Sequence, residues 1–254
     1  MPVNLKWFNV MRRRSKNSLQ GIILLVFLAA LFAAIFYRHK APIETAKVSG
    51  YSVEVLKPFT FSNDTDIKEW EEKVFKGKVI YRVEKDGDLS YVKAESNKAA
   101  SALYYKIKMD AKSGRPTISW KWRADKFPVK VNKESLDTEN EDDFAARVYV
   151  IFPAMFFTNS RVLEYVWAES LPVGTTGVSP YSKNIKLMVL ESGPKKDWAL
   201  EDRDIHADYV AMFGREPEYN IGAVAFMTNA EHTGSSAGAV YDEIKLGYKV
   251  GGGN

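Results

Sequence analysis

The sequence of 254 residues contains no cysteine. Structural disulfides are therefore excluded, and so is the lipid attachment to cysteine that holds lipoproteins on membranes. A domain of this chain outside the cytoplasm has to be stabilised by its hydrophobic core. The roughly 200 residues that follow the N-terminal region are enough to form one.

Histidine is also scarce, with three residues in the chain: His39, His206 and His232. No two of them have the spacing of a zinc motif, so a zinc site would need carboxylates for most of its ligands, which is uncommon. Residues 234–238 (GSSAG) match the Gly-x-Ser-x-Gly pattern of hydrolases, but no histidine follows them to act as a base. The sequence therefore predicts no recognisable catalytic apparatus.

Negative charge is missing from the start of the chain, where seven basic residues precede the first acid, Glu44. Beyond this segment 29 basic residues face all 32 acidic ones, a net charge of −3. The overall charge of +4 therefore comes from the N-terminal segment. The composition predicts no nucleic-acid binding by the rest of the chain.

Residues 19–37 (LQGIILLVFLAALFAAIFY) carry no charge and are almost wholly apolar. As a helix they would span about 28 Å, close to the thickness of a bilayer core. The basic residues before them place residues 1–18 in the cytoplasm as a basic tail. A cleaved signal peptide is the alternative, but the bulky, basic flank at residues 37–40 is a poor cleavage site. We therefore predict an uncleaved signal-anchor helix, followed by a linker over residues 38–50.

Short strands are predicted through residues 51–248 by alternating apolar residues and by turn residues between them. We expect strands at residues 51–56, 78–85, 88–94, 101–109, 116–123, 144–152, 162–167, 185–190, 221–227 and 239–246. The strand over residues 144–152 has the clearest pattern, with Val148 and Val150 on its apolar face and Arg147 and Tyr149 on the other. It is therefore expected at the centre of a sheet.

Helical spacing is confined to residues 201–213, which Gly214 would end, and to a turn near residues 67–74. The predicted fold class is mainly β, a jelly-roll-like antiparallel β-sandwich with one short helix, preceded by the N-terminal transmembrane helix. Residues 51–248 are predicted to form the extracytoplasmic domain. Residues 249–254, with three successive glycines, are expected to form a flexible tail.

A run of acids precedes the central strand and ends at Asp142 and Asp143. Crowded carboxylates need solvent, a cation or a guanidinium to offset their repulsion, and Arg147 is a candidate. The run is either a solvated loop or part of a polar ligand site. A second set of candidate ligand-binding residues consists of Arg203, Asp204 and Asp208. These residues form either an internal ion-pair network or a polar ligand cleft.

Trp167 and Trp198 lie next to loop residues and are the candidates for stacking on a sugar ring. Trp120 and Trp122 share one strand face and are assigned to the core instead. No cofactor is predicted, with a structural calcium at Asp242 and Glu243 as the alternative, because Ca²⁺ takes hard carboxylate ligands.

Five motifs occur in a specific order along the chain: PTISWKWRAD, EDDFAARVYVIF, RVLEYVWA, RDIHADY and AVYDEIKL. Together they resemble domain-of-unknown-function family 3047, bacterial exported proteins without an established activity, over most of residues 55–247. In that family the segment matching residues 228–233 usually reads Thr-Asp-x-Asp-x-Thr. Here it reads Thr-Asn-Ala-Glu-His-Thr, and the lower carboxylate count weakens a metal site there. The opening Phe-rich strand, the FKGK entry to the hairpin and the closing AVYDEIKL are also similar in pattern to galactose-binding-like jelly rolls, including carbohydrate-binding modules.

These observations predict a single-pass protein of the bacterial inner membrane whose C-terminal domain lies in the periplasm. The leading functional hypothesis is a non-catalytic binding module for a glycan or another polar ligand. An accessory subunit of a larger membrane complex is the first alternative. A carboxylate-dependent, glycan-active enzyme is the second, although the many acids nominate no catalytic pair.

Overall fold

The computed structural model of the protein describes residues 44–48, 51–62 and 64–250. The predicted cytoplasmic tail at residues 1–18 and the predicted membrane span at residues 19–37 lie outside them. Within the described ranges no helix is both long and apolar enough to cross a membrane.

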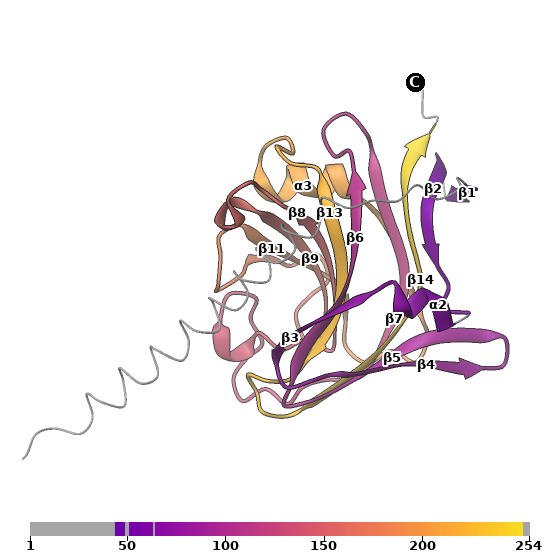
Figure 1. The fold of residues 1–254 in the computed structure, drawn as a ribbon. Helices are drawn as coiled ribbons and strands as arrows, with labels where there is room; N and C mark the ends of the chain where they lie inside the picture. The colour runs from indigo at the N-terminus through magenta and orange to yellow at the C-terminus, as the bar shows by residue number, and fades with distance from the viewer. Residues whose placement is uncertain (1–43, 49–50, 63, 251–254) are drawn as a thin grey trace, which may run out of the picture.

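Two seven-stranded sheets, called A and B below, pack face to face (Figure 1). Sheet A contains β1 (Glu44–Val48), β2 (Tyr51–Phe59), β4 (Ile80–Asp86), β5 (Leu89–Asn97), β7 (Pro116–Lys126), β12 (Ala199–Asp204) and β14 (Ser236–Val250). Sheet B contains β3 (Glu71–Lys76), β6 (Ala100–Met109), β8 (Ala146–Phe152), β9 (Arg161–Ala168), β10 (Thr176–Val178), β11 (Ile185–Ser192) and β13 (Ile221–Asn229).

The strand order confirms a mainly β sandwich but corrects the prediction that all its strands are antiparallel. Sheet B runs β10-β11-β9-β8-β13-β6-β3, and its β9 and β11 are parallel rather than antiparallel. Parallel neighbours need a long crossover, and residues 169–184 provide one that includes β10. In sheet A the long β14 pairs with β2 and β5 along one edge and with β7 along the other.

Several segments take their structure from strand pairing that periodicity does not reveal. The predicted linker contains β1, which pairs with β2, and the predicted tail gives its first two residues to β14. The predicted turn at residues 67–74 divides into α2 (Asp64–Lys68) and β3. The single predicted helix divides into β12, which pairs with β7, and α3 (Ile205–Phe213). The described chain thus has two α-helices, besides the 3-10 turns η1 (Glu139–Glu141) and η2 (Phe157–Asn159).

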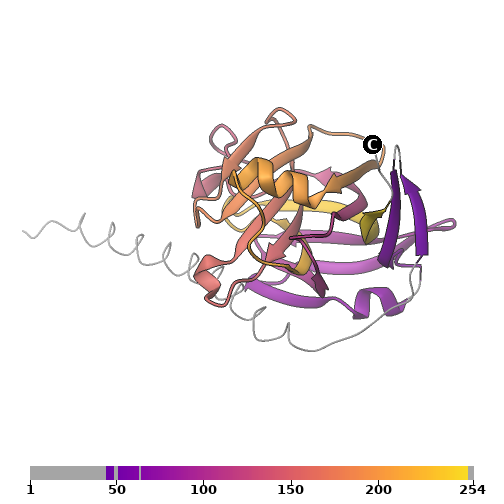
Figure 2. The same cartoon turned by 90° about the horizontal axis from the view of Figure 1, so that it is seen from above.

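Helix α3 packs across one end of the sandwich against β7, β9 and β12 (Figures 1 and 2). Its first turn is capped by Asp204, whose carboxylate accepts a hydrogen bond of 2.9 Å from the Ala207 amide. It ends at Gly214, which adopts a left-handed conformation with φ 67°. Ile205 and Tyr209 are fully buried and attach the helix to the core.

The core between the sheets is rich in aromatic side chains. Trp120 and Trp122 of β7 are fully buried, as their assignment to the core predicted. The Trp122 ring lies 5.6 Å from that of Trp167 on β9, in an edge-to-face arrangement. Val148 and Val150 of β8 face the same core, which confirms the predicted inward stripe of the central strand.

A second apolar cluster covers the opposite face of sheet B, which explains why every residue of β8 and β9 is buried. Residues 127–145, between β7 and β8, supply Leu136 and Phe144 to this cluster. Glu134 fixes the segment, because its buried carboxylate pairs with Lys130 at 2.8 Å and accepts backbone hydrogen bonds from residues 169–171. We call residues 127–145 the cover segment.

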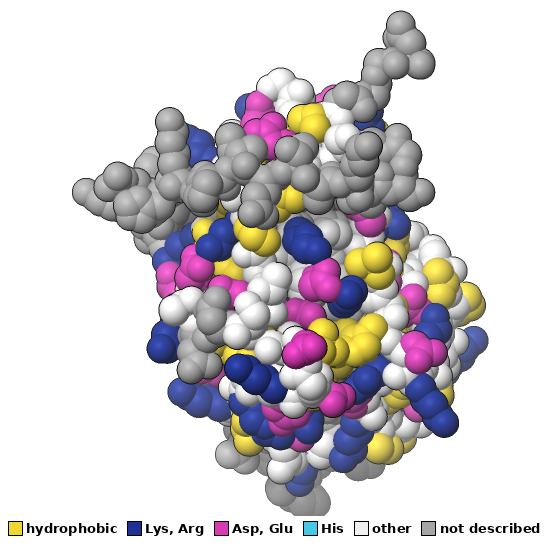
Figure 3. Space-filling model, turned by 90° about the vertical axis from the view of Figure 1, so that its right-hand side faces the viewer, with side chains coloured by type: hydrophobic (Ala, Val, Ile, Leu, Met, Phe, Trp, Pro, Cys, Tyr) yellow, Lys and Arg dark blue, Asp and Glu magenta, His cyan; other side chains and the backbone are white. Residues whose placement is uncertain are grey.

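The outer face of sheet A has a different character. Arg82 contacts both Glu84 and Glu95 at 2.6 Å, and Lys93 lies near the same two acids. Figure 3 shows positive and negative side chains interspersed on the side of the molecule that this sheet forms. Exposed pairs of this kind contribute at most about 1 kcal/mol each.

Candidate functional site

The candidate site is a cavity of about 80 Å³ on the face of sheet B that points away from the core between the sheets. Strands β3, β6, β8, β9, β11 and β13 contribute to its wall, together with the segment before β8, the loop between β10 and β11 and the loop after β13. Most of the surface that lines it is apolar, although it also exposes parts of polar residues: Lys76, Asp142, Arg147, Tyr149, Glu164, Ser179, Tyr181, Glu231 and His232. Mainly apolar walls with a few convergent polar groups are typical of small-ligand sites.

Arg147 forms the centre of the polar floor. Its guanidinium forms a short ion pair with Asp142 and donates a further hydrogen bond to the Asp142 carbonyl at 3.1 Å. Its Nη1 donates to the Tyr149 hydroxyl at 3.3 Å. Burial disfavours the charge of Arg147, but Asp142 and Glu164 outweigh that effect and raise its pKa. The sequence prediction that Arg147 offsets the acids is confirmed for Asp142.

Arg147 and Glu164 leave hydrogen-bonding capacity unused. Arg147 Nε lies 3.1 Å from Glu164 Oε1, yet neither atom has a hydrogen-bond partner among the described residues. Both side chains are about 95% buried. Both residues line the cavity, and a donor and an acceptor this deeply buried without a partner are costly in a finished core.

A second polar cluster lies beside the first one. Asp143 accepts hydrogen bonds of 2.7 Å from Asn229 Nδ2 and from the Thr233 amide. His232 Nδ1 lies 3.0 Å from Glu231 and 3.4 Å from Asp143. Burial opposes a charge on His232, but hydrogen bonds to Asp143 and Glu231 raise its pKa to about 10. His232 is therefore an imidazolium cation at neutral pH.

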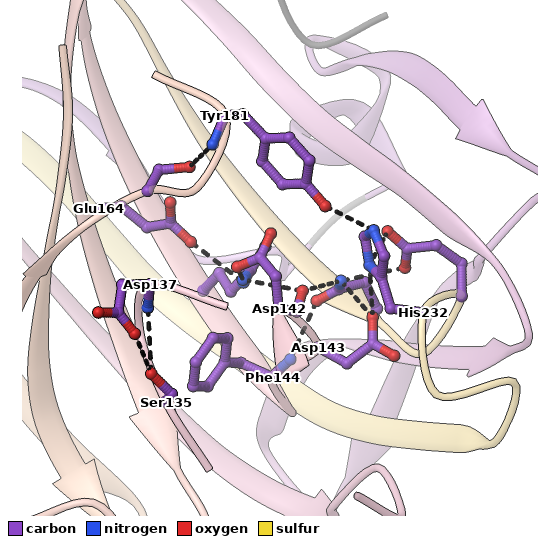
Figure 4. A network of polar contacts seen from close by, with 12 residues as sticks. Ser135, Asp137, Asp142, Asp143, Phe144, Glu164, Tyr181 and His232 are labelled. Atoms are coloured by element: carbon purple, nitrogen blue, oxygen red, sulfur yellow. Dashed lines mark hydrogen bonds and ion pairs between the residues drawn. The ribbon is translucent and has the colours of Figure 1, made fainter. Parts of the chain in front are cut away.

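Tyr181 connects the two loops beside the cavity. Its hydroxyl and His232 Nε2 are 2.6 Å apart, so the loop between β10 and β11 contacts the loop after β13 (Figure 4). On the other side of His232, Asn229 Nδ2 donates to the Asp142 carbonyl and Asn229 Oδ1 accepts from the Phe144 amide. These bonds hold residues 142–144 at the end of β13.

Asp143, Glu231 and His232 also form the one group in the described chain whose ligand atoms, within 4.8 Å of one another, have the types that hold a metal ion. The oxygens of Asp143 already accept from Asn229 and Thr233. The charged His232 lies between Asp143 and Glu231, where a bound cation would lie. The charge of His232 offsets one of the two carboxylates of the cluster.

The second set of predicted ligand residues does not join this cavity. Arg203 pairs with Asp208 at 2.5 Å, and the Tyr165 hydroxyl donates to the same carboxylate at 2.7 Å. Tyr165 faces the core between the sheets, whereas its neighbour Glu164 faces the cavity. The two sets therefore meet opposite faces of sheet B, and the structure does not bring them together in one site.

Asp204 has a structural role instead of sharing a helix face with Asp208. Besides capping α3, its carboxylate pairs with Arg115 at 2.8 Å and Lys249 at 3.0 Å. It thereby joins the start of α3 to the end of β14.

The two tryptophans predicted to stack on a sugar lie in different parts of the fold. Trp167 is fully buried in the core and donates to the Gly193 carbonyl, so its expected exposure is wrong. Loop residues adjoin it in sequence, but Trp122 covers its ring. Trp198 is half-buried on sheet A, 5.5 Å from the Tyr91 ring and from the Arg123 guanidinium. It lies far in the fold from the cavity, on the other sheet.

Asp242 and Glu243, the predicted calcium ligands, lie at an irregularity in β14. Glu243 has a positive φ of 46° and pairs with both Lys121 and Lys245. Asp242 is buried and its Oδ1 has no hydrogen-bond partner in the described structure; burial raises its pKa to about 6. Both ammonium groups thus lie beside the Glu243 carboxylate.

Sequence reasoning missed Glu164, Tyr181, Glu231 and His232 as members of the site. Glu164 carries a readable signal, since it is a single acid within the otherwise apolar strand segment VLEYVW. A buried acid in such a strand needs a partner from the neighbouring strand, and Arg147 is the adjacent basic residue. Tyr181 gives no such signal, because only the chain path brings its loop to the cavity.

The fold and site together define a β-sandwich with a polar cavity on the outer face of one sheet. The family model described as "Protein of unknown function (DUF3047)" matches residues 68–245, and the chain belongs to this family. No curated protein matches the sequence.

Solved structures with a similar fold include sugar-binding and sugar-cleaving proteins. One is the family 11 carbohydrate-binding module of cellulase Lic26A-Cel5E of Clostridium thermocellum, with 11% identity, a TM-score of 0.39, and coverage of 78% of this chain and 98% of that one. Another is the endoglucanase cel12A from Rhodothermus marinus, with 11% identity, a TM-score of 0.40, and coverage of 84% and 99%. At these TM-scores the likeness says nothing about the ligand of this chain.

Proposed function

We propose that the protein is a binding module that holds a small polar ligand, a single unit of a glycan, in the cavity on sheet B. The observation that carries the proposal is that Arg147 and Glu164, whose Nε and Oε1 atoms lack hydrogen-bond partners, both line the cavity. A hydroxyl group can donate to the carboxylate and accept from the guanidinium. A sugar ring presents several such groups.

The remaining lining supports the same ligand chemistry. Tyr149, Tyr181 and Phe75 supply aromatic surface, which suits the apolar face of a sugar ring. A bound water takes about 10–15 Å³ on the same measure, so 80 Å³ holds about five to eight of them. The space thus suits one ring and not a long chain.

Membrane attachment belongs to the same proposal. The apolar, uncharged residues 19–37 would anchor the protein in the bacterial inner membrane, with the sandwich in the periplasm. The module would then bind its ligand close to the membrane.

The experiment is titration of the purified protein with neutral oligosaccharides, with a variant for each candidate surface. Ala102→Leu adds bulk at the cavity wall and should abolish binding. Trp198→Ala, on the other sheet, should leave binding unchanged. The opposite result would place the ligand on sheet A, and a parent protein that binds none of these oligosaccharides would reject a neutral glycan as the ligand. Shortened products in the same samples would favour the enzymatic alternative.

The second candidate is an accessory subunit, favoured by exposed apolar side chains between β8 and β9. Met155 and Phe156 are 76% and 69% exposed at this turn. Such side chains would contact a partner protein. Affinity purification from native membranes should then recover a stoichiometric partner, and Phe156→Ser should release it.

A further inference from the structure

Around the cavity, carboxylates outnumber the buried cations. Arg147 faces two carboxylates, Asp142 and Glu164. His232 also faces two, Asp143 and Glu231. Each buried cation of the site is thus outnumbered, and the remaining lining cation, Lys76, has an exposed side chain whose charge solvent screens.

Glu164 is the carboxylate whose charge is least compensated. Arg147 and Tyr149 face it from β8 and Asp142 faces it from the turn after η1, while its neighbour on β11 is the apolar Leu187. Burial raises the pKa of Glu164, Arg147 opposes that effect, Asp142 adds to it, and the balance is upward. Lys130, a buried cation in the cover segment, is already paired with Glu134.

An anionic ligand would add a further negative charge to a buried site that already has an excess of negative charge. A neutral hydroxyl could donate a hydrogen bond to the Glu164 carboxylate but would not offset its charge. A protonated amine does both, since N⁺–H donors to carboxylates make the stronger, charge-assisted hydrogen bonds.

We infer, on the basis of the proposed binding function, that the ligand carries a protonated amine that binds Glu164, as the ring of an unacetylated amino sugar does. The ammonium group donates to Glu164, and the hydroxyl groups beside it reach Arg147 and Tyr149. Binding favours the ionised form of Glu164, so the proton of a neutral Glu164 is released to the solvent as the ligand enters.

The test compares short oligosaccharides of glucosamine and of N-acetylglucosamine, which differ in the charge of one substituent on each ring. Calorimetric titration of the full-length protein should show tighter binding of the glucosamine form by about tenfold or more, the ratio that one additional charge-assisted hydrogen bond provides. Its affinity should rise between about pH 5 and about pH 7, as Glu164 ionises, and buffers of different ionisation enthalpy should reveal proton release. The N-acetylated form should show neither effect.

Glu164→Gln keeps the shape of the side chain and removes its charge. It should lose the preference for glucosamine and retain binding of the N-acetylated form, while Glu71→Gln, at an exposed pair outside the cavity, should behave as the parent. If Glu164→Gln does not fold, proton release and pH dependence in the parent decide the question. Equal affinity of the parent for both oligosaccharides would overturn the amine and leave the binding module intact. If the parent binds neither these nor the neutral panel, the binding function itself fails.

Discussion

Replacement of Arg147 by methionine is the most direct test of how the site is held together. Methionine fills most of the space but removes the guanidinium from between Asp142 and Glu164, which then remain as buried acids without a cation. Breaking a buried pair in this way costs about 3–5 kcal/mol. That is a large share of the 5–15 kcal/mol of stability that is usual for a folded domain.

The pH dependence separates lost charge compensation from lost packing. At neutral pH the variant must keep Glu164 ionised without a cation or protonate it, and protonation is free of cost only below about pH 4.3, where the unfolded chain is protonated too. The free-energy difference between parent and Arg147→Met should therefore be largest near neutral pH and should shrink as the pH falls. A packing defect alone would give a difference that does not change with pH.

The assay is urea unfolding of the purified protein, followed by tryptophan fluorescence across a range of pH. Arg82→Met is the matched control, because Arg82 also contacts two acids, Glu84 and Glu95, but on the exposed face of sheet A. Its effect should stay within about 1 kcal/mol. If Arg147→Met proved no more destabilising than this control at neutral pH, the buried cluster would not stabilise the fold as argued.

Two further predictions concern the cover segment and the response of the fold to pH. Glu134→Ala should destabilise the protein by about 3–5 kcal/mol, because it leaves Lys130 buried without its partner, and hydrogen exchange should quicken first at the amides of residues 169–171. An effect no larger than that of Glu71→Ala would contradict this role. Burial raises the pKa of Glu201 to about 7, above its ordinary 4.5, so the folded protein retains a proton that the unfolded chain releases. Its contribution to stability is present at low pH and lost as the pH rises from about 4.5 to about 7. Unfolding free energies of the parent and of Glu201→Gln should accordingly diverge over this window, and parallel pH profiles would reject the assignment.

The sandwich was predictable because alternation is a local property. The strand at residues 144–152 shows Val148 and Val150 on one face and Arg147 on the other, and the structure places them so. Strands β1 and β12 were not predictable, since each is defined by the strand it pairs with. The parallel pairing of β9 and β11 depends on the path of the crossover, which no local pattern reveals.

The site was half predictable for a related reason. Asp142, Asp143 and Arg147 are close in sequence, so their proximity could be expected. Arg203 and Asp208 are also close to each other in sequence. Whether this pair lies near Arg147 depends on which face of sheet B the pair contacts, and the sequence does not show that face. His232 was not predicted as a site residue because no other histidine lies at ligand spacing from it. In the structure its partners are two carboxylates and a tyrosine.

Strand β1 changes how far the sandwich can move from an anchor. The linker expected over residues 38–50 would have allowed the domain to sweep through a wide volume. Because sheet A already begins at Glu44, only residues 38–43 remain between the apolar run and the first hydrogen-bonded strand. Six residues reach at most about 20 Å, even when fully extended. An anchored sandwich would therefore work within roughly one domain diameter of the bilayer, and its cavity would meet only ligands that come to the membrane surface.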